Sequence, residues 1–111
     1  PYRFATVLEA EGDYEQALDH YRKSIALDRR RADLRFDFGL FLLKTGQLHE
    51  GQRQYNKGIR FLSGPRAQRY LLDAISELKR AIPKLPSSEE TQSILVKLRR
   101  ELNRFDKEAR R

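Results

Sequence analysis

Apolar residues recur at helical spacing along nearly the whole chain. Phe4 and Leu8 share one face of a short first segment. Five longer stripes follow at intervals of three and four residues, over residues 14–27, 32–44, 48–61, 67–82 and 87–109. Turn-forming Gly and Pro residues separate the stripes, at Gly12, Gly46, Gly64 and Pro83. The pattern predicts an all-α fold of about six helices.

The first two thirds of the chain contain a repeat of 34 residues. A shift of that length pairs large residues with large ones, such as Tyr21 with Tyr55, and small with small, such as Ala17 with Gly51. Each unit, over residues 1–31 and 32–65, is expected to form two helices joined by a turn. Small residues are expected to let the helix backbones approach closely, at Ala5, Ala17, Ser24, Gly39, Gly51 and Gly58.

Two stretches of the first unit carry the motif most clearly. They are Gly12-Asp13-Tyr14-Glu15-Gln16-Ala17 and Tyr21-Arg22-Lys23-Ser24-Ile25-Ala26-Leu27-Asp28. The second unit shows the same pattern at Phe38-Gly39, Leu42, Gly46, Tyr55, Gly58 and Ile59. A 34-residue helix-turn-helix unit of this kind resembles the tetratricopeptide repeat.

The resemblance implies an α-solenoid of antiparallel helix pairs, with the first helices lining a concave groove that binds a peptide or helix of another protein. It therefore favours a scaffold or adaptor. Arg29 and Ser63 replace the family's usual proline, and Pro1 and Arg35 stand where it has a bulky aromatic residue. Because Pro1 falls about three residues inside the unit, we expect the first repeat to be truncated at its N-terminus.

The resemblance also implies which side chains face the groove. They are Tyr2, Thr6, Glu9, Asp33, Phe36, Asp37, Leu40, Leu43, Lys44, Tyr70 and Ala74. Phe36, Leu40 and Leu43 either form a hydrophobic groove floor or belong to the core beneath the next helix pair. The family members that clamp C-terminal carboxylates use Lys and Asn at set positions, and the residues here are Tyr2, Thr6 and Asp37. That subtype is therefore not expected.

Residues 66–111 depart from the repeat. We expect a capping helix pair there, over about residues 67–82 and 87–109, with Ser87 as the N-cap of the last helix. The last helix carries an apolar stripe at Ile94, Leu95, Leu98, Leu102 and Phe105. Because the stripe approximates heptad spacing, a dimerising coiled coil is the alternative to a cap. Self-association through the ends of the repeats is a further alternative function, so a homo-oligomer is possible.

The net charge of +7 comes from 23 Lys and Arg against 16 Asp and Glu, and its excess lies in residues 65–111. On the last helix, Arg100, Arg104, Lys107 and Arg111 recur at helical spacing, which predicts a basic ridge. Such a ridge makes docking on nucleic acid or an anionic membrane the alternative function. Acidic residues are interleaved with it and no aromatic platform accompanies it, which argues against nucleic acid.

The sequence offers no catalytic or metal-binding constellation. It has no Cys, and His49-Glu50 is followed by Arg53 where a zinc-protease helix needs its second His. We therefore expect a non-enzyme without a cofactor. The longest apolar run, from Leu40 to Leu43, is far shorter than the ~20 residues of a transmembrane helix. A soluble protein is expected. Its compartment is not predicted, because the sequence is compatible with both the cytoplasm and the periplasm.

Overall fold

The computed structural model describes residues 13–109. Within that range the chain is helical and contains no strand. The α-helices are α2 (Tyr14–Leu27), α3 (Ala32–Lys44), α4 (Leu48–Phe61), α5 (Ala67–Ala81) and α6 (Glu89–Ala109), with a 3-10 turn, η1 (Ile82–Lys84), after α5. The all-α prediction is confirmed. The expected helix around Phe4 and Leu8 lies outside the described residues, as do Tyr2, Thr6, Glu9 and Arg111.

The helix ends follow local signals. The backbone N–H of Gln16 donates to the Asp13 carboxylate (3.3 Å), so Asp13 caps α2. Gly46 ends the α3–α4 turn with a φ of 83°, which favours glycine. The cap of α6 differs from the expectation at Ser87. Ser88 accepts from the backbone N–H of Thr91 (3.1 Å) and donates to the Thr91 hydroxyl (2.8 Å), so the cap lies one residue later.

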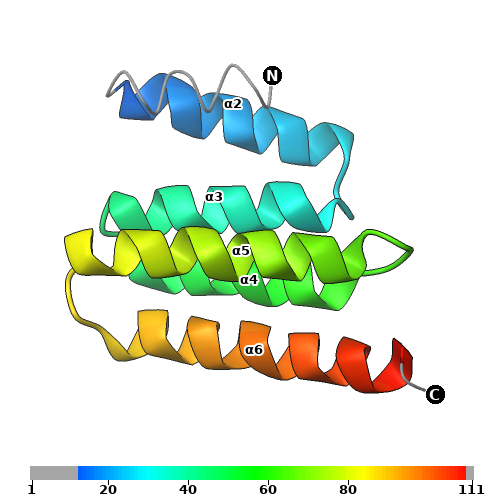
Figure 1. Ribbon diagram of the computed structural model, residues 1–111. Helices are drawn as coiled ribbons and strands as arrows, with labels where there is room; N and C mark the ends of the chain where they lie inside the picture. The colour runs from blue at the N-terminus through cyan, green and yellow to red at the C-terminus, as the bar shows by residue number, and fades with distance from the viewer. Residues whose placement is uncertain (1–12, 110–111) are drawn as a thin grey trace.

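The helices form antiparallel neighbours along the chain (Figure 1). Helix α3 packs on α4, and α5 packs on α6. The two pairs also meet, because α3 contacts α5 and α4 contacts α6, and α2 lies against the remaining side of α3. Helix α3 is therefore covered from several directions, and ten of its 13 residues are buried.

Glycines set the spacing between α3 and α4. A Cβ on Gly39 would lie 3.2 Å from the Gly51 carbonyl oxygen, and a Cβ on Gly51 would lie 3.1 Å from the Gly39 carbonyl oxygen. At Gly58 a Cβ would lie 2.5 Å from the ring of Phe36. The expectation that small residues let the helix backbones approach closely is therefore confirmed at Gly39 and Gly51, whereas at Gly58 the missing side chain makes room for the Phe36 ring.

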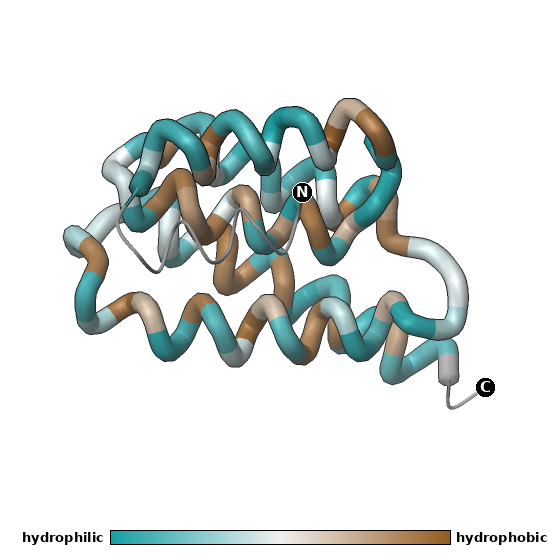
Figure 2. The backbone as a smooth tube through the Cα atoms, turned by 90° about the horizontal axis from the view of Figure 1, so that it is seen from above, coloured by the Kyte–Doolittle hydropathy of each residue, from teal (hydrophilic) through white to brown (hydrophobic). Residues whose placement is uncertain are grey.

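Two clusters of buried side chains hold the helices together. The first joins α2 to α3 and is rich in aromatic rings, with Tyr21 stacked on Phe38 at a centroid distance of 5.3 Å. The second runs from α3 through α4 and α5 to α6 and includes Tyr55, Leu71 and Leu98. Figure 2 shows the pattern that produces both clusters, hydrophobic residues recurring along the helices between hydrophilic ones.

The apolar stripe of α6 is part of the second cluster. Ile94, Leu95 and Leu98 are buried, and Leu102 and Phe105 pack partly buried against them. Because this surface contacts α4 and α5 of the same chain, the expected coiled-coil surface is already covered.

Arg35 occupies the position where the repeat family has a bulky aromatic residue. Its guanidinium donates to the Arg29 carbonyl oxygen (2.9 and 3.2 Å) and to the Gln54 side-chain oxygen (2.9 Å), and it lies over the ring of Phe61 at 5.7 Å. Burial, with a smaller contribution from the charge of Arg29, lowers the pKa of Arg35. The buried cation thus joins the loop before α3 to α4, and within residues 13–109 it has no carboxylate partner.

Candidate binding face on α3 and α5

The three apolar residues of the expected groove are core residues. Phe36 is 3%, Leu40 9% and Leu43 0% exposed. They belong to one buried cluster with Leu71, Ala74 and Leu78 of α5, which covers this side of α3. A hydrophobic groove floor made of these side chains is therefore wrong, and the core alternative is correct.

The polar members of the expected groove set remain at the surface. Asp33 and Asp37 of α3 are half-buried, and Lys44 at the end of α3 is exposed. Tyr70 of α5 is also half-buried, and Ala74 of the same helix is buried. Since α3 and α5 are in contact, these residues border one polar face formed by two helices.

The structure adds two residues to this face that the sequence did not single out. Asp73 and Glu77 lie on α5 at helical spacing from Tyr70, and Glu77 contacts Asp37 of α3. The sequence contained an indication that Glu77 belongs to this face, because Glu77 follows Leu43, an expected groove residue, by the repeat length of 34 residues. We call the surface bordered by Asp37, Lys44, Tyr70, Asp73 and Glu77 the α3–α5 face.

The carboxyl groups of Asp37 and Glu77 form a hydrogen-bonded pair. Burial, followed by the negative charge and hydrogen bond of Glu77, raises the pKa of Asp37 to about 8. The charge of Asp73 acts in the same direction, and Lys44 opposes it. At neutral pH the Asp37–Glu77 pair therefore holds one proton between its two carboxyl groups.

The same two carboxyls act on the core beneath them. Burial, together with the negative charges of Asp37 and Glu77, raises the pKa of Tyr55. Tyr55 is the side chain that packs against the backbone of Gly39. The α3–α5 face thus lies next to the contact between Tyr55 and Gly39, which sets the spacing between α3 and α4.

The expected basic ridge is exposed on α6. Arg100, Arg104 and Lys107 lie at the surface, and Arg99 joins them around a shallow hollow that also includes Val96 and Asn103. Arg104 pairs with Glu101 at 2.8 Å and lies over the ring of Phe105.

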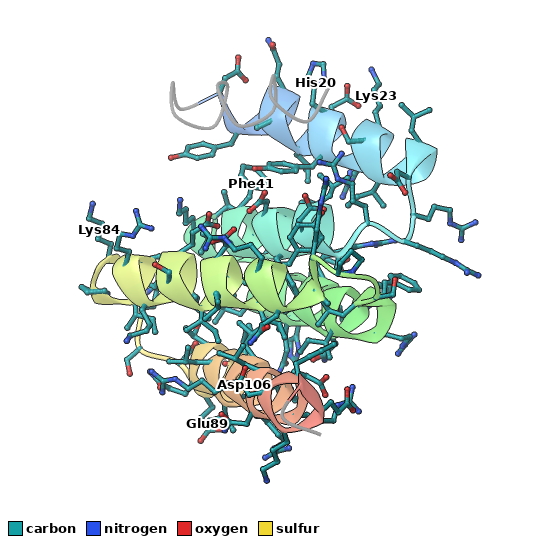
Figure 3. The ribbon with its side chains drawn as sticks, turned by 45° about the vertical axis from the view of Figure 1, so that its right-hand side comes forward. His20, Lys23, Phe41, Lys84, Glu89 and Asp106 are labelled. Carbon is teal, nitrogen blue, oxygen red and sulfur yellow. The ribbon has the colours of Figure 1, made fainter. Side chains whose placement is uncertain are left out.

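The remaining ionisable residues show no further site. His20 stands on α2, on the side away from α3, next to the ion pair of Lys23 with Asp19 (Figure 3). Across residues 13–109, no three His, Asp or Glu side chains come together in a way that could hold a metal ion. No helix in this range has both the length and the apolar character needed to cross a bilayer.

Neither models of known protein families nor curated protein sequences match this chain. The resemblance to the tetratricopeptide repeat therefore depends on the residues quoted above and on their positions in the structure.

Proposed function

We propose that this chain is a protein-binding module of the tetratricopeptide type, and that the α3–α5 face holds a segment of the partner. The close approach at Gly39, Gly51 and Gly58 supports the repeat, because these are its expected small positions. The contacts of α3 with α5 and of α4 with α6 suit a solenoid of stacked helix pairs. In such an array α3 and α5 are the groove-lining helices.

One observation carries the proposal: two carboxyl groups from different helices meet at a partly exposed surface. Asp37 and Glu77 lie 40 residues apart in the chain, and the packing of α3 on α5 brings them together. Bringing two carboxyls together disfavours folding when both are ionised. Groups held in such a perturbed state are concentrated at functional sites.

The chemistry of the face indicates what the partner presents. A Lys or Arg side chain placed between Asp37 and Glu77 would replace the shared proton with a permanent positive charge. Both carboxyls would then be ionised and paired, which removes the repulsion. Asp73 adds a third negative charge nearby. We therefore propose a basic peptide or helix as the ligand, although the chain as a whole has a net charge of +7.

A peptide-display selection on the immobilised protein tests this function. Selected peptides should share Lys or Arg, and their affinity for the variant Asp37→Asn/Glu77→Gln should fall about tenfold or more, the loss expected when a partly buried charge pair is removed. The matched control is Asp28→Asn/Glu108→Gln, which removes two exposed carboxylates elsewhere. Equal affinity for both variants, or peptides enriched only in acidic residues, would contradict the proposal.

A further inference from the structure

The exposed side of α6 concentrates positive charge. Arg99, Arg100, Arg104 and Lys107 surround one shallow hollow, and we call these four residues the α6 basic stripe. At 1.5 Å per residue the stripe extends about 12 Å along the helix. It lies beside the half-exposed Val96 and continues toward the C-terminal end of α6.

Of the acidic residues interleaved in the sequence, Asp106 is directed away from the stripe, Glu101 is paired with one of its members, and Glu108 is exposed beside Lys107. Asp106 accepts a hydrogen bond from Gln68, which belongs to α5, so its carboxylate is directed toward that helix. Figure 3 shows Asp106 on α6 below α5. The Glu101 side chain is only 18% exposed and is paired with Arg104.

Three of the four cations in the stripe are available to pair with an anionic ligand. Among the residues that the structure describes, no carboxylate forms an ion pair with Arg99, Arg100 or Lys107. All three side chains are exposed. The interleaving of acids with bases, one of the two reasons against a polyanion partner, therefore leaves these three cations without an ion pair to any described residue at the surface of α6.

A polyanion that binds this stripe must contact the exposed side of α6. Helices that lie in a membrane interface bury their apolar side in the lipid. The apolar side of α6 is already used, since Ile94 and Leu98 are fully buried inside the protein. Among the described residues of α6, Val96 is the one large apolar side chain that is exposed. A phosphodiester backbone needs no such insertion, and the guanidinium groups of Arg fit phosphate through paired hydrogen bonds.

We propose that the α6 basic stripe binds the phosphate backbone of a nucleic acid. This function goes beyond the binding of a protein segment, because it uses α6 and not the α3–α5 face. With three or four phosphates contacted, log K should fall with log salt at a slope of about −3. The binding is independent of base sequence, since the stripe offers cations and one amide at Asn103.

Fluorescence anisotropy with a labelled 20-base-pair DNA duplex measures this binding directly. Between 50 and 200 mM salt, wild-type affinity should fall about 60-fold, which is the consequence of that slope. The variant Arg99→Gln/Arg100→Gln/Lys107→Gln should bind at least about 30-fold more weakly at 50 mM salt, with a slope near −1. Arg104 is retained because it is paired with Glu101.

The control variant is Lys79→Gln/Arg80→Gln/Lys84→Gln, which removes three exposed cations at the end of α5 and in η1. Both triple variants change the net charge by the same amount. We expect the control to keep its affinity within about threefold, the change attributable to net charge alone. Equal losses in the two variants would overturn the proposal, as would binding to phosphatidylserine vesicles without binding to the duplex. Circular dichroism should show unchanged helix content in both variants.

Discussion

Asp37 and Glu77 share a hydrogen bond between α3 and α5, the two helices that border the candidate binding face. The pair holds a proton at neutral pH that an isolated Asp would have released. It therefore links three properties of the chain: the packing of two helix pairs, the pH dependence of stability, and the class of ligand that the face accepts.

Stability should decrease as pH rises from about 4 to 8. The pKa of Asp37 is about 8 in the folded chain and 3.8 when unperturbed, so in this window the folded state holds a proton that the unfolded state releases. Rising pH therefore favours unfolding, by about 1.4 kcal/mol for each pH unit between these two pKa values. Urea unfolding between pH 5 and 8.5 measures the effect. The variant Asp37→Asn should lose this part of the pH dependence, and an unchanged slope would contradict the assignment.

Leu40→Asp should unfold the protein or lower its melting temperature sharply. Leu40 is 9% exposed and belongs to the cluster shared by α3 and α5, so a carboxylate there would be buried without a partner. Leu72→Asp is the matched control, because Leu72 lies on α5 but is 44% exposed. Thermal melts followed by circular dichroism should separate the two variants clearly. Similar melts would place Leu40 at the surface.

Gly39→Ala should destabilise the chain by about 1–3 kcal/mol, the usual cost of overpacking a core. The new Cβ would lie 2.7 Å from the Tyr55 ring and 3.2 Å from a backbone oxygen of α4. In an exposed helix the same substitution stabilises, since Ala is a better helix former than Gly. A lower free energy of unfolding in the variant would therefore support the close approach of α3 and α4 at Gly39, and a higher one would contradict it. Gln92→Ala, at an exposed position of α6, should change stability by less than about 0.5 kcal/mol.

Arg35→Ala should cost about 2–4 kcal/mol, because it removes three hydrogen bonds and leaves the Arg29 carbonyl and the Gln54 amide oxygen without their donor. A double-mutant cycle with Gln54→Ala measures the coupling between the two side chains. Chemical denaturation of the four proteins provides the free energies. A coupling near zero would show that Arg35 stabilises the chain through its contact with the Phe61 ring and not through Gln54. Arg22→Ala, at an exposed position of α2, serves as the control.

Most of the secondary structure could be predicted because its signals are local. The stripe over residues 48–61 and the turn at Gly46 follow from neighbours a few residues apart, and α4 has these bounds. The N-cap of α6 was predicted one residue too early, at Ser87, because Ser87 and Ser88 are both suitable N-cap residues. Only the reciprocal hydrogen bonds with Thr91 distinguish them.

The binding face was harder to predict because it depends on contacts between distant segments. Whether Phe36 and Leu43 were groove or core depended on where α5 packs, and no local pattern contains that information. The repeat register predicted Tyr70 as a groove residue, and in the structure Tyr70 is half-buried on α5. Glu77 was not predicted because a charged residue at that position of the repeat is expected to be a solvated side chain. Only the structure shows that it lies beside Asp37.

The pH dependence of peptide binding tests the central claim most directly. A Lys- or Arg-containing peptide from the selection should bind about tenfold more tightly for each pH unit between 6 and 8, and equally well above 8, because Asp37 must lose its proton to pair with the cation. Isothermal titration calorimetry in buffers of different ionisation enthalpy should show one proton released at pH 7. Affinity that is independent of pH, with no proton released, would contradict a site built on Asp37 and Glu77.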